Sequence, residues 1–321
     1  MAAPVVSVVM PVYNGERFLA EAVESVLGQT YANFELVAVD DASTDASGRI
    51  LDRYRDPRVR VLKNDRNLGG ARSANRGIAE ARGVYVARLD QDDVSLPRRL
   101  EKQVEFLERH PDIAVVGTWA EIIDEQGREI GHRRFATESA DLREALLRFC
   151  ALVHSSVMFR RDPVMAAGSY GTSALGRHCR DYELWLRLSE TLRLANLPEV
   201  LVKYRVHPEQ MSAERVLGLI RDTAACRKHA LRRRQSAGLG GSAPLTRLAR
   251  LRGDLGSIGY DYWQYADLRA RQGNSRLELQ LKLRAMFYSP LSPRTRRALS
   301  AAIPRAVGWC ARRLGVTGSR A

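Results

Sequence analysis

Apolar runs and helical repeats alternate along the chain up to Thr118. Short runs rich in β-branched residues predict strands that are buried on both faces: Val5–Met10, Phe34–Val39, Val59–Leu62, Val84–Leu89 and Ile113–Thr118. Apolar residues at helical spacing predict helices between these strands: Glu16–Gln29, Asp45–Tyr54, Asn67–Ala81 and Pro97–Arg109. The alternation predicts an α/β fold with a three-layer, mostly parallel, Rossmann-like sheet.

The pattern is looser in the rest of the chain. We expect a strand at Ser155–Arg160, a helix at Asp181–Ser189 and a last strand at Leu201–Val206. After Glu214 the spacing is helical, with a Gly/Ser break at Gly238–Ser242 and helical blocks at about 243–272 and 275–287. The sequence therefore predicts an α/β domain over residues 1–215 and a helical region over residues 216–321.

Charge is unevenly distributed. The formal net charge is +14, and residues 227–321 carry 20 Lys and Arg but only 4 Asp and Glu, which leaves 31 basic and 33 acidic residues in 1–226. A basic tail suggests an anionic surface, either phospholipid or nucleic acid. The alternative is a solvated, arginine-rich helical surface. Because the tail contains no RNA-binding signature, we favour a membrane surface over nucleic acid.

Cysteine usage and hydropathy indicate the compartment. The four cysteines form no CxxC pair, which argues against a zinc site or a disulfide framework and favours reduced thiols. The apolar start of the chain has no basic leader, so it is interpreted as a strand. No stretch reaches the roughly 20 apolar residues that span a bilayer. We expect a cytoplasmic protein that lies, if it meets a membrane, on the inner face of the plasma membrane.

Polar side chains follow the predicted strands. Tyr13 follows the first strand, Asp40 and Asp41 end the second, and Asp90 and Asp92 follow the fourth. Ligands of such sheets bind at the carboxyl ends of the strands. The clustering therefore predicts a binding site at this edge.

The stretch ARLDQDDVSLP places Asp90, Asp92 and Asp93 within four residues. Crowded carboxylates repel one another, and a hard divalent cation relieves that repulsion while bridging to substrate phosphates. D-x-D at a strand end therefore suits Mg²⁺ or Mn²⁺ holding a diphosphate. The alternative is a helix N-cap formed by Asp93 or Ser95. No Walker-type GxxxxGK[ST] motif or strand-linked GxGxxG offers another phosphate cradle.

The motifs carry a family likeness. The segments VSVVMPVYNGERFLAEAVESVLGQTYANFELVAVDDASTD and NLGGARSANRGIAEARGVYVARLDQDDVSLPRRLEKQVEFL are followed by HSSVMFRR, RDYELWLRL and VKYRVH. In this order the chain resembles the family-2 glycosyltransferases of the GT-A nucleotide-diphosphosugar transferase fold, over about residues 4–210. The likeness implies a GT-A catalytic domain followed by a helical, basic C-terminal extension.

The resemblance also implies residues that bind the nucleotide. Pro11 and Tyr13 would line the pocket of the base. Asp40 would accept a hydrogen bond from the base, usually uracil, and Asp90 would lie near the ribose. The implied donor is a nucleotide-diphosphosugar, most often a UDP-sugar.

Three further positions would carry the chemistry. Asp92 matches the metal-binding carboxylate, His207 the histidine that completes the metal or diphosphate site, and Asp181 the catalytic base. Asp181 has an alternative as an N-terminal helix charge or cap, and His207 as a turn residue. The family usually has Glu where this chain has Arg180, which could instead touch the acceptor or the diphosphate.

Other polar and aromatic residues have two interpretations each. His154 is either a satisfied core histidine or a contact for the donor. Arg72 or Arg76 either reaches the nucleotide or lies on a solvated helix face. Trp185 is interpreted as core rather than as a platform for a sugar.

The resulting hypothesis is an inverting, metal-dependent glycosyltransferase that acts on a glycan or lipid-linked acceptor in cell-envelope or exopolysaccharide biosynthesis. The processive Q-x-x-R-W motif is absent, which favours transfer of single sugars. Two alternatives remain: a nucleotidyltransferase of similar fold, and a non-catalytic module that binds a membrane or nucleic acid through its tail.

Overall fold

The computed structural model describes residues 4–207, 213–238 and 282. Its strands are β1 (Val6–Val12), β2 (Phe34–Asp40), β3 (Val59–Lys63), β4 (Tyr85–Arg88), β5 (Val94–Ser95), β6 (Ile113–Ile123), β7 (Glu129–Arg133), β8 (Met158–Arg160) and β9 (Arg193–Arg205). Its helices are α1 (Leu19–Leu27), α2 (Ser47–Leu51), α3 (Gly70–Glu80), α4 (Arg99–Arg109), α5 (Ser139–Leu146), α6 (Arg161–Ala166), α7 (Arg180–Thr191) and α8 (Ala213–Ser236), with a 3₁₀ turn, η1, at His154–Ser156.

One sheet runs through the described α/β part of the chain. Its order is β3-β2-β1-β4-β8-β6-β9-β5, with β7 paired to β6. Strands β1 to β4 are parallel, and β8 lies antiparallel between β4 and β6, so β6 and β9 again run in the direction of β1. The prediction of a mostly parallel sheet is confirmed. The carboxyl ends of β1, β2, β4, β6 and β9 consequently share one edge.

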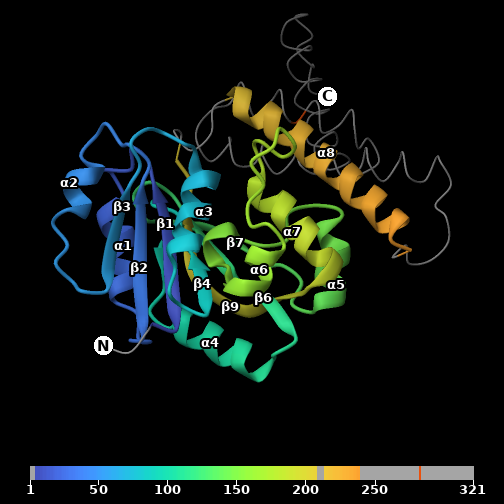
Figure 1. Cartoon of the computed structure of the whole chain (residues 1–321), viewed down its shortest axis with the longest axis horizontal. Coiled ribbons are helices and arrows are strands. Elements are labelled where there is room, and N and C mark those ends of the chain that lie inside the picture. Colours follow the sequence, from blue (N-terminus) through green and yellow to red (C-terminus); the bar gives the residue numbers. More distant parts are fainter. Residues whose placement is uncertain (1–3, 208–212, 239–281, 283–321) are drawn as a thin grey trace, which may run out of the picture. The chain divides into compact units, whose positions relative to one another are not determined.

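Helices cover both faces of the sheet (Figure 1). Residues of β1 alternate between the two cores: Val8 packs with α1 and α4, whereas Val9 packs with α3 and α7. The approach of α3 is close, because a Cβ at Gly77 would lie only 2.5 Å from Cγ1 of Val9. The three-layer architecture predicted from the alternating pattern is confirmed.

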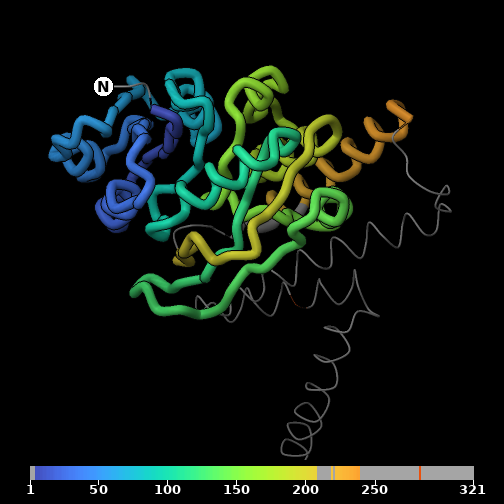
Figure 2. Tube along the Cα trace, turned by 90° about the horizontal axis from the view of Figure 1, so that it is seen from below, coloured from blue at the N-terminus to red at the C-terminus, as the bar shows by residue number. Residues whose placement is uncertain are grey.

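Strand β9 is longer than predicted. It begins at Arg193 rather than at Leu201, and it runs parallel to β6 (Figure 2). Pro198 and Glu199 interrupt the apolar pattern, which concealed the first half of the strand. The pairing tolerates them because the register shifts between Thr118 and Trp119 of β6, so that the two residues remain unpaired.

Four elements were not predicted: β5, β7, α5 and α6. Strand β5 has two residues, and β7 reads EIGHR with mostly exposed or half-buried positions. Such short or polar segments carry little periodic signal. They are fixed by their neighbours, since β5 pairs with β9 and β7 pairs with β6.

Helix α8 packs against α7, and the Arg233 guanidinium makes a bidentate contact with Glu190. The first compact unit of the chain runs to Gly240. The domain division at residue 215 stays a prediction, and the helical blocks expected beyond Gly238 lie outside the described residues. Within the residues described, no helix has the length and apolar character needed to cross a membrane.

Candidate active site

The loop after β1 is held by Gln91, the middle residue of the D-x-D stretch. The Tyr13 N–H donates to Gln91 Oε1 (2.8 Å), and Gln91 Nε2 donates to the Tyr13 carbonyl (3.0 Å). Gly15 makes room, because a Cβ there would lie 2.4 Å from Gln91 Cδ. Tyr13 itself is 45% exposed, and Pro11 is half-buried in β1 beside Val39. The Tyr13 ring is therefore presented at the sheet edge on a fixed backbone.

The loops after β1 and β2 are joined by polar contacts. The N–H of Gly15 donates to Ser47 Oγ (2.8 Å), and that of Glu16 donates to Asp45 Oδ2 (3.0 Å). Asn14 has a positive φ of 49° and accepts from the Thr44 N–H (2.8 Å). Asparagine tolerates this conformation better than most residues. The two loops thus form one rigid ledge at the carboxyl edge.

Asp40 and Asp41, at the end of β2, have different roles. Asp40 is 6% exposed, and its Oδ1 accepts the Ser43 N–H (3.0 Å). The Asp41 carboxylate accepts the N–H groups of Leu68 (2.9 Å) and Gly69 (2.8 Å), which fixes the NLGG turn before α3. Burial opposes the charge of Asp41, but these hydrogen bonds outweigh it and lower its pKa. Asp41 is therefore structural.

Asp90 lies in a network of cationic and aromatic groups. It pairs with Arg88 (3.0 Å) and with Nδ1 of His154 (3.1 Å), and His154 Nε2 contacts the Tyr170 hydroxyl (2.8 Å). Burial would raise the pKa of Asp90, but His154 first and Arg88 second hold it well below its usual range. Both ring nitrogens of His154 have partners, which agrees with a satisfied histidine.

Tyr170 connects this network to α7. Its ring packs near that of Trp185, which is fully buried as expected for a core residue. Burial raises the pKa of Tyr170, Arg88 opposes the rise, and the charges of Asp90 and Asp181 add to it. The charges of both carboxylates therefore act on the Tyr170 hydroxyl.

Asp92 and His207 meet although 115 residues separate them, with 3.0 Å between Asp92 Oδ2 and His207 Nε2. Their side chains are 17% and 10% exposed, and the Phe18 ring packs against the imidazole. No group of three or more His, Cys, Asp or Glu side chains gathers as a metal site among the described residues. A carboxylate oxygen and an imidazole nitrogen nevertheless suit Mn²⁺ or Mg²⁺ when substrate phosphates and waters supply the remaining ligands.

Asp93 does not cap a helix. It is 1% exposed and accepts the Arg205 N–H (2.8 Å), while Arg205 Nε donates to the Asp92 carbonyl (2.9 Å). Helix α4 begins at Arg99 without a side-chain cap, so the N-cap interpretation of Asp93 or Ser95 was wrong. Burial, followed by the Asp92 and Asp90 charges, raises the pKa of Asp93.

The carboxylates of the triplet therefore have partners within the protein. Arg88 and His154 hold Asp90, His207 holds Asp92, and a backbone N–H holds Asp93. Partners from the protein thus offset the repulsion between the three carboxylates without a bound cation. The case for a metal now depends on the Asp92–His207 pair.

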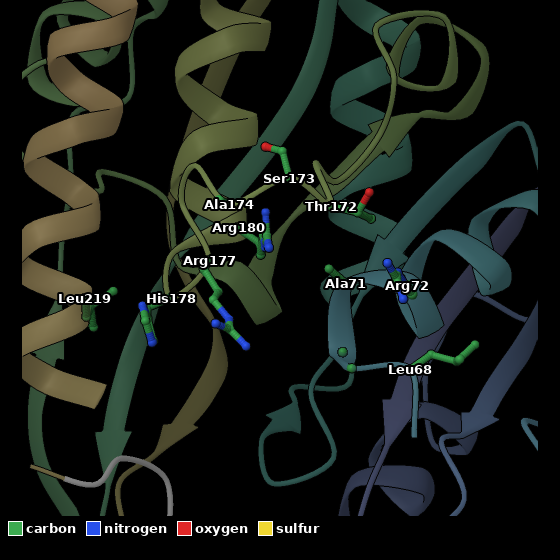
Figure 3. Close-up of a pocket in the computed structure, with 12 residues that line it drawn as sticks. Leu68, Ala71, Arg72, Thr172, Ser173, Ala174, Arg177, His178, Arg180 and Leu219 are labelled. Atoms are coloured by element: carbon green, nitrogen blue, oxygen red, sulfur yellow. The ribbon is translucent and has the colours of Figure 1, made fainter. Parts of the chain in front are cut away.

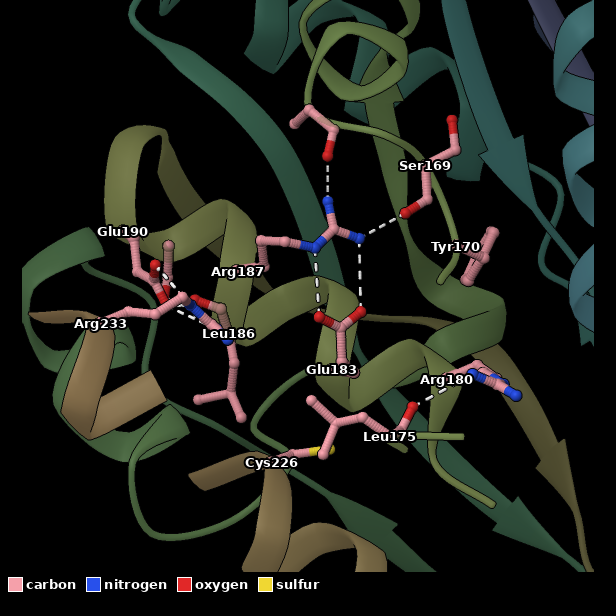
Figure 4. Close-up of polar contacts among 12 residues, drawn as sticks. Ser169, Tyr170, Leu175, Arg180, Glu183, Leu186, Arg187, Glu190, Cys226 and Arg233 are labelled. Atoms are coloured by element: carbon pink, nitrogen blue, oxygen red, sulfur yellow. Dashed lines mark hydrogen bonds and ion pairs between the residues drawn. The ribbon is translucent and has the colours of Figure 1, made fainter. Parts of the chain in front are cut away.

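Asp181 lies in the first turn of α7 and is half-buried. Helix α7 has no side-chain cap, so the capping alternative for Asp181 was wrong, although its charge still suits the helix N-terminus. The Arg187 guanidinium holds Glu183 (3.2 Å) and the carbonyls of Ala167 and Ser169 (Figure 4). These contacts join α7 to the turn before Tyr170 and so fix the position of Asp181.

A cavity of about 870 Å³ has Arg180, the residue before Asp181 in the chain, in its lining (Figure 3). Its lining comes from the turn before α3 and the start of that helix, from the segment before α7 and the first residue of α7, and from one residue of α8: Leu68, Gly69, Gly70, Ala71, Arg72, Thr172, Ser173, Ala174, Arg177, His178, Arg180 and Leu219. The seven residues predicted to bind donor or metal or to act as base do not belong to this lining. Arg72 does, whereas Arg76 donates to the carbonyl of Lys63 (2.7 Å) and has a structural role.

Sequence reasoning missed Gln91, Arg88, Arg205 and Tyr170. Arg88 and Arg205 are each 2% exposed, and each reaches an aspartate of the triplet or its backbone. The available signal was an arginine inside an apolar strand, as in VARLD, because a buried guanidinium needs acceptors nearby. Tyr170 carried no comparable signal.

The three-layer α/β arrangement, with polar side chains gathered at the carboxyl edge of its sheet, is similar to the GT-A fold of glycosyltransferases. The model of the family described as Glycosyl transferase family 2 matches residues 7–166. The chain is 40% identical over 208 residues to EpsE of Bacillus subtilis (strain 168), a protein with a provisional glycosyltransferase name, covering 64% of this chain and 74% of EpsE. It is 33% identical over 215 residues to the amylovoran biosynthesis glycosyltransferase AmsE of Erwinia amylovora, covering 65% and 79%.

Solved structures agree on the fold. S. aureus TarS 1–349 is similar with a TM-score of 0.54 at 18% identity, covering 90% of this chain and 92% of that one. The mannosyltransferase PcManGT from Pyrobaculum calidifontis, in complex with GDP-Man and Mn²⁺, is similar with a TM-score of 0.52 at 18% identity, covering 89% and 88%. The chain belongs to glycosyltransferase family 2. This membership favours glycosyl transfer over nucleotidyl transfer.

Proposed function

We propose that this protein is a metal-dependent, inverting glycosyltransferase that moves a sugar from a nucleotide-diphosphosugar, such as a UDP-sugar, to a hydroxyl group of a glycan or lipid-linked acceptor. The observation that carries the proposal is the meeting of Asp92 and His207 at the carboxyl edge of the sheet. The names of AmsE and of TarS bound to UDP-GlcNAc support polysaccharide biosynthesis and a nucleotide-sugar donor.

The donor would lie along the rigid ledge after β1 and β2. Tyr13 offers an exposed ring on which a base can stack, and Pro11 lies next to it in β1. Asp40 would accept a hydrogen bond from the base, and Asp90 would face the ribose. Because the Gln91 and Ser47 contacts fix this ledge before the donor arrives, little ordering entropy is lost on binding.

Asp92 and His207 would hold the metal ion. Mg²⁺ or Mn²⁺ bound there supplies Lewis-acid stabilisation of the diphosphate leaving group. Arg205 positions Asp92 by donating to its carbonyl, and the Phe18 ring positions His207. The carboxylate and the imidazole are thereby held in place for a common ligand.

Asp181 would act as the base. The acceptor hydroxyl oxygen forms a bond to the anomeric carbon while the bond from that carbon to the diphosphate oxygen breaks. The hydroxyl proton passes to the Asp181 carboxylate, and the bonding electrons leave with the nucleoside diphosphate. Attack from the side opposite the leaving group inverts the anomeric configuration. Positioned proton transfer of this kind contributes about 10²–10⁴-fold.

The test uses the purified full-length chain, a panel of UDP- and GDP-sugars, and Mn²⁺ or Mg²⁺, with release of the nucleoside diphosphate as the readout. We expect metal-dependent turnover that EDTA abolishes and that Asp92→Asn lowers by about a hundredfold or more. Asp162→Asn is the matched control, because the Asp162 side chain is 84% exposed and remote from the strand-end aspartates in sequence. Full turnover in EDTA, or by Asp92→Asn, would refute the metal role.

A further inference from the structure

Three arginines, Arg72, Arg177 and Arg180, belong to the lining of the 870 Å³ cavity. Arg177 comes from the segment before α7, Arg180 is the first residue of α7, and Arg72 comes from α3 on the other side (Figure 3). Within the part of the chain that the structure describes, its lining contains no Asp or Glu. The lining of the cavity is therefore cationic, whereas the strand-end site described above is acidic.

Among the described residues these charges have no carboxylate partner. Arg72 and Arg177 form no ion pair or side-chain hydrogen bond with any described residue, and Arg180 donates to the Leu175 carbonyl (3.1 Å). Arg187 and Arg233 nearby behave differently, because each grips a glutamate through two nitrogens (Figure 4). The arginines around the cavity are thus left available to a ligand.

The segment that carries Arg177 is anchored at both ends. The His178 N–H and ring both contact Asp222 of α8 (2.9 and 3.0 Å), and the Tyr170 backbone exchanges two hydrogen bonds with Asn75 of α3. Its middle residues, from Thr172 to Ala174, are exposed and line the cavity. The arginines are therefore presented on a fixed loop.

Arginine forks match phosphate geometry and bind it through charge-assisted hydrogen bonds. The volume is within the range of small-ligand sites. Leu68 and Leu219 add apolar surface to the lining. The chemistry that fits is an anion with phosphoryl oxygens, with room for a further group beside it.

We propose that this cavity binds the phosphoryl group of a phosphate- or diphosphate-bearing acceptor substrate. The inference rests on the proposed function, because it takes Asp181 as the base that faces the acceptor. Arg180 directly precedes Asp181, so a phosphoryl group bound there brings the rest of the acceptor next to the carboxylate. The residues assigned to donor and metal do not line the cavity, which argues against the donor diphosphate as its occupant.

The test is calorimetric titration of the full-length chain with inorganic diphosphate and, separately, farnesyl diphosphate, in EDTA so that the metal site cannot contribute. We expect both probes to bind the native protein. Arg177→Gln and Arg72→Gln should each weaken binding by about tenfold, as expected for loss of one charge-assisted contact, and Arg177→Lys should restore part of it. The control Arg109→Gln removes the same charge from an exposed site on α4 and should change nothing.

The two probes separate the sources of the phosphoryl group. Tighter binding of farnesyl diphosphate supports a lipid-linked acceptor, and equal binding supports a phosphorylated glycan. Absence of binding by the native chain, or equal binding by Arg177→Gln and the native chain, overturns the inference. Titration with UDP and Mn²⁺ is the parallel measurement. If the native chain binds diphosphate but not UDP, the proposed donor site fails and the cavity is an anion site whose role as acceptor site is overturned.

Discussion

The candidate site has an acidic side, at the strand ends, and a cationic side, around the cavity, and the two differ in whether their charges have partners within the protein. On the strand-end side, each carboxylate of the acidic triplet already has a partner in the protein, from Arg88 and His154 to His207 and the Arg205 backbone. On the other side, three arginines and, among the described residues, no Asp or Glu line the cavity. The acidic side is therefore organised before any ligand binds. The arginines of the cationic side, by contrast, depend on a bound anion to neutralise their charge.

The largest effect on the transfer rate is expected at Asp181, the proposed base, which directly follows Arg180 of the cationic side. Asp181→Asn should lower acceptor-dependent transfer by about 10²–10⁴-fold, because the amide cannot take the hydroxyl proton. Binding of UDP with Mn²⁺, measured by calorimetry, should be unchanged. The control is Asp141→Asn, which removes an exposed carboxylate from the first turn of α5. Equal losses in both variants would assign Asp181 a helix-stabilising role only.

A smaller effect, on the stability of the fold, is expected when the Asp41 carboxylate of the acidic side is replaced. Asp41→Asn places an amide against the N–H groups of Leu68 and Gly69 and should lower the free energy of unfolding near neutral pH by about 1–3 kcal/mol. The pKa of Asp41 is lowered on folding, so its contribution is complete above the ordinary carboxyl pKa and is lost as pH falls through the lower folded value.

Urea unfolding at neutral and acid pH measures this dependence. The difference between native protein and Asp41→Asn should shrink on acidification. Asp65→Asn, an exposed aspartate shortly before the same turn, serves as the control and should show no difference at either pH. A gap between native protein and Asp41→Asn that stays constant with pH would contradict the assignment of Asp41 as an ionised anchor.

The smallest effect on catalysis is expected from loss of the Gln91 side chain, whose hydrogen bonds join the end of β4 to the loop after β1. Gln91→Ala removes both hydrogen bonds to the Tyr13 backbone and should raise the KM for the donor by about 3–10-fold with little change in kcat. Steady-state kinetics with the best donor of the panel provides the values. Gln126→Ala, in an exposed turn, is the control. A lower kcat at unchanged KM would place Gln91 in the chemistry rather than in donor binding.

The strand-end residues could be predicted because Asp40 and Asp90 follow apolar runs directly, and parallel strands bring their ends to one edge. Their partners could not be predicted from local pattern. His154 reaches Asp90 across 64 residues and His207 reaches Asp92 across 115, contacts that depend on the pairing of β8 and β9 with the rest of the sheet. His207 was found only through the family likeness.

The cationic cavity was also hidden from the sequence. Arg177 lies in a segment without apolar periodicity, and its distance from Arg72 along the chain exceeds one hundred residues. The packing of α7 and α8, the His178–Asp222 contact and the Tyr170–Asn75 hydrogen bonds bring this segment opposite α3. Charge alone drew attention to the C-terminal tail, whereas the arginines that converge in the described structure come from the α/β unit.

The most direct test asks whether the acidic side and the cationic side bind different ligands. Two ligands are titrated against each of two variants, Asp92→Asn and Arg177→Gln. Calorimetry would record UDP binding with Mn²⁺ and inorganic diphosphate binding in EDTA for each variant. We expect Asp92→Asn to lose the first and keep the second, and Arg177→Gln to keep the first and weaken the second about tenfold. If each variant lost the binding of both ligands, or if neither variant lost any binding, the separation of an acidic donor side from a cationic acceptor side would be contradicted.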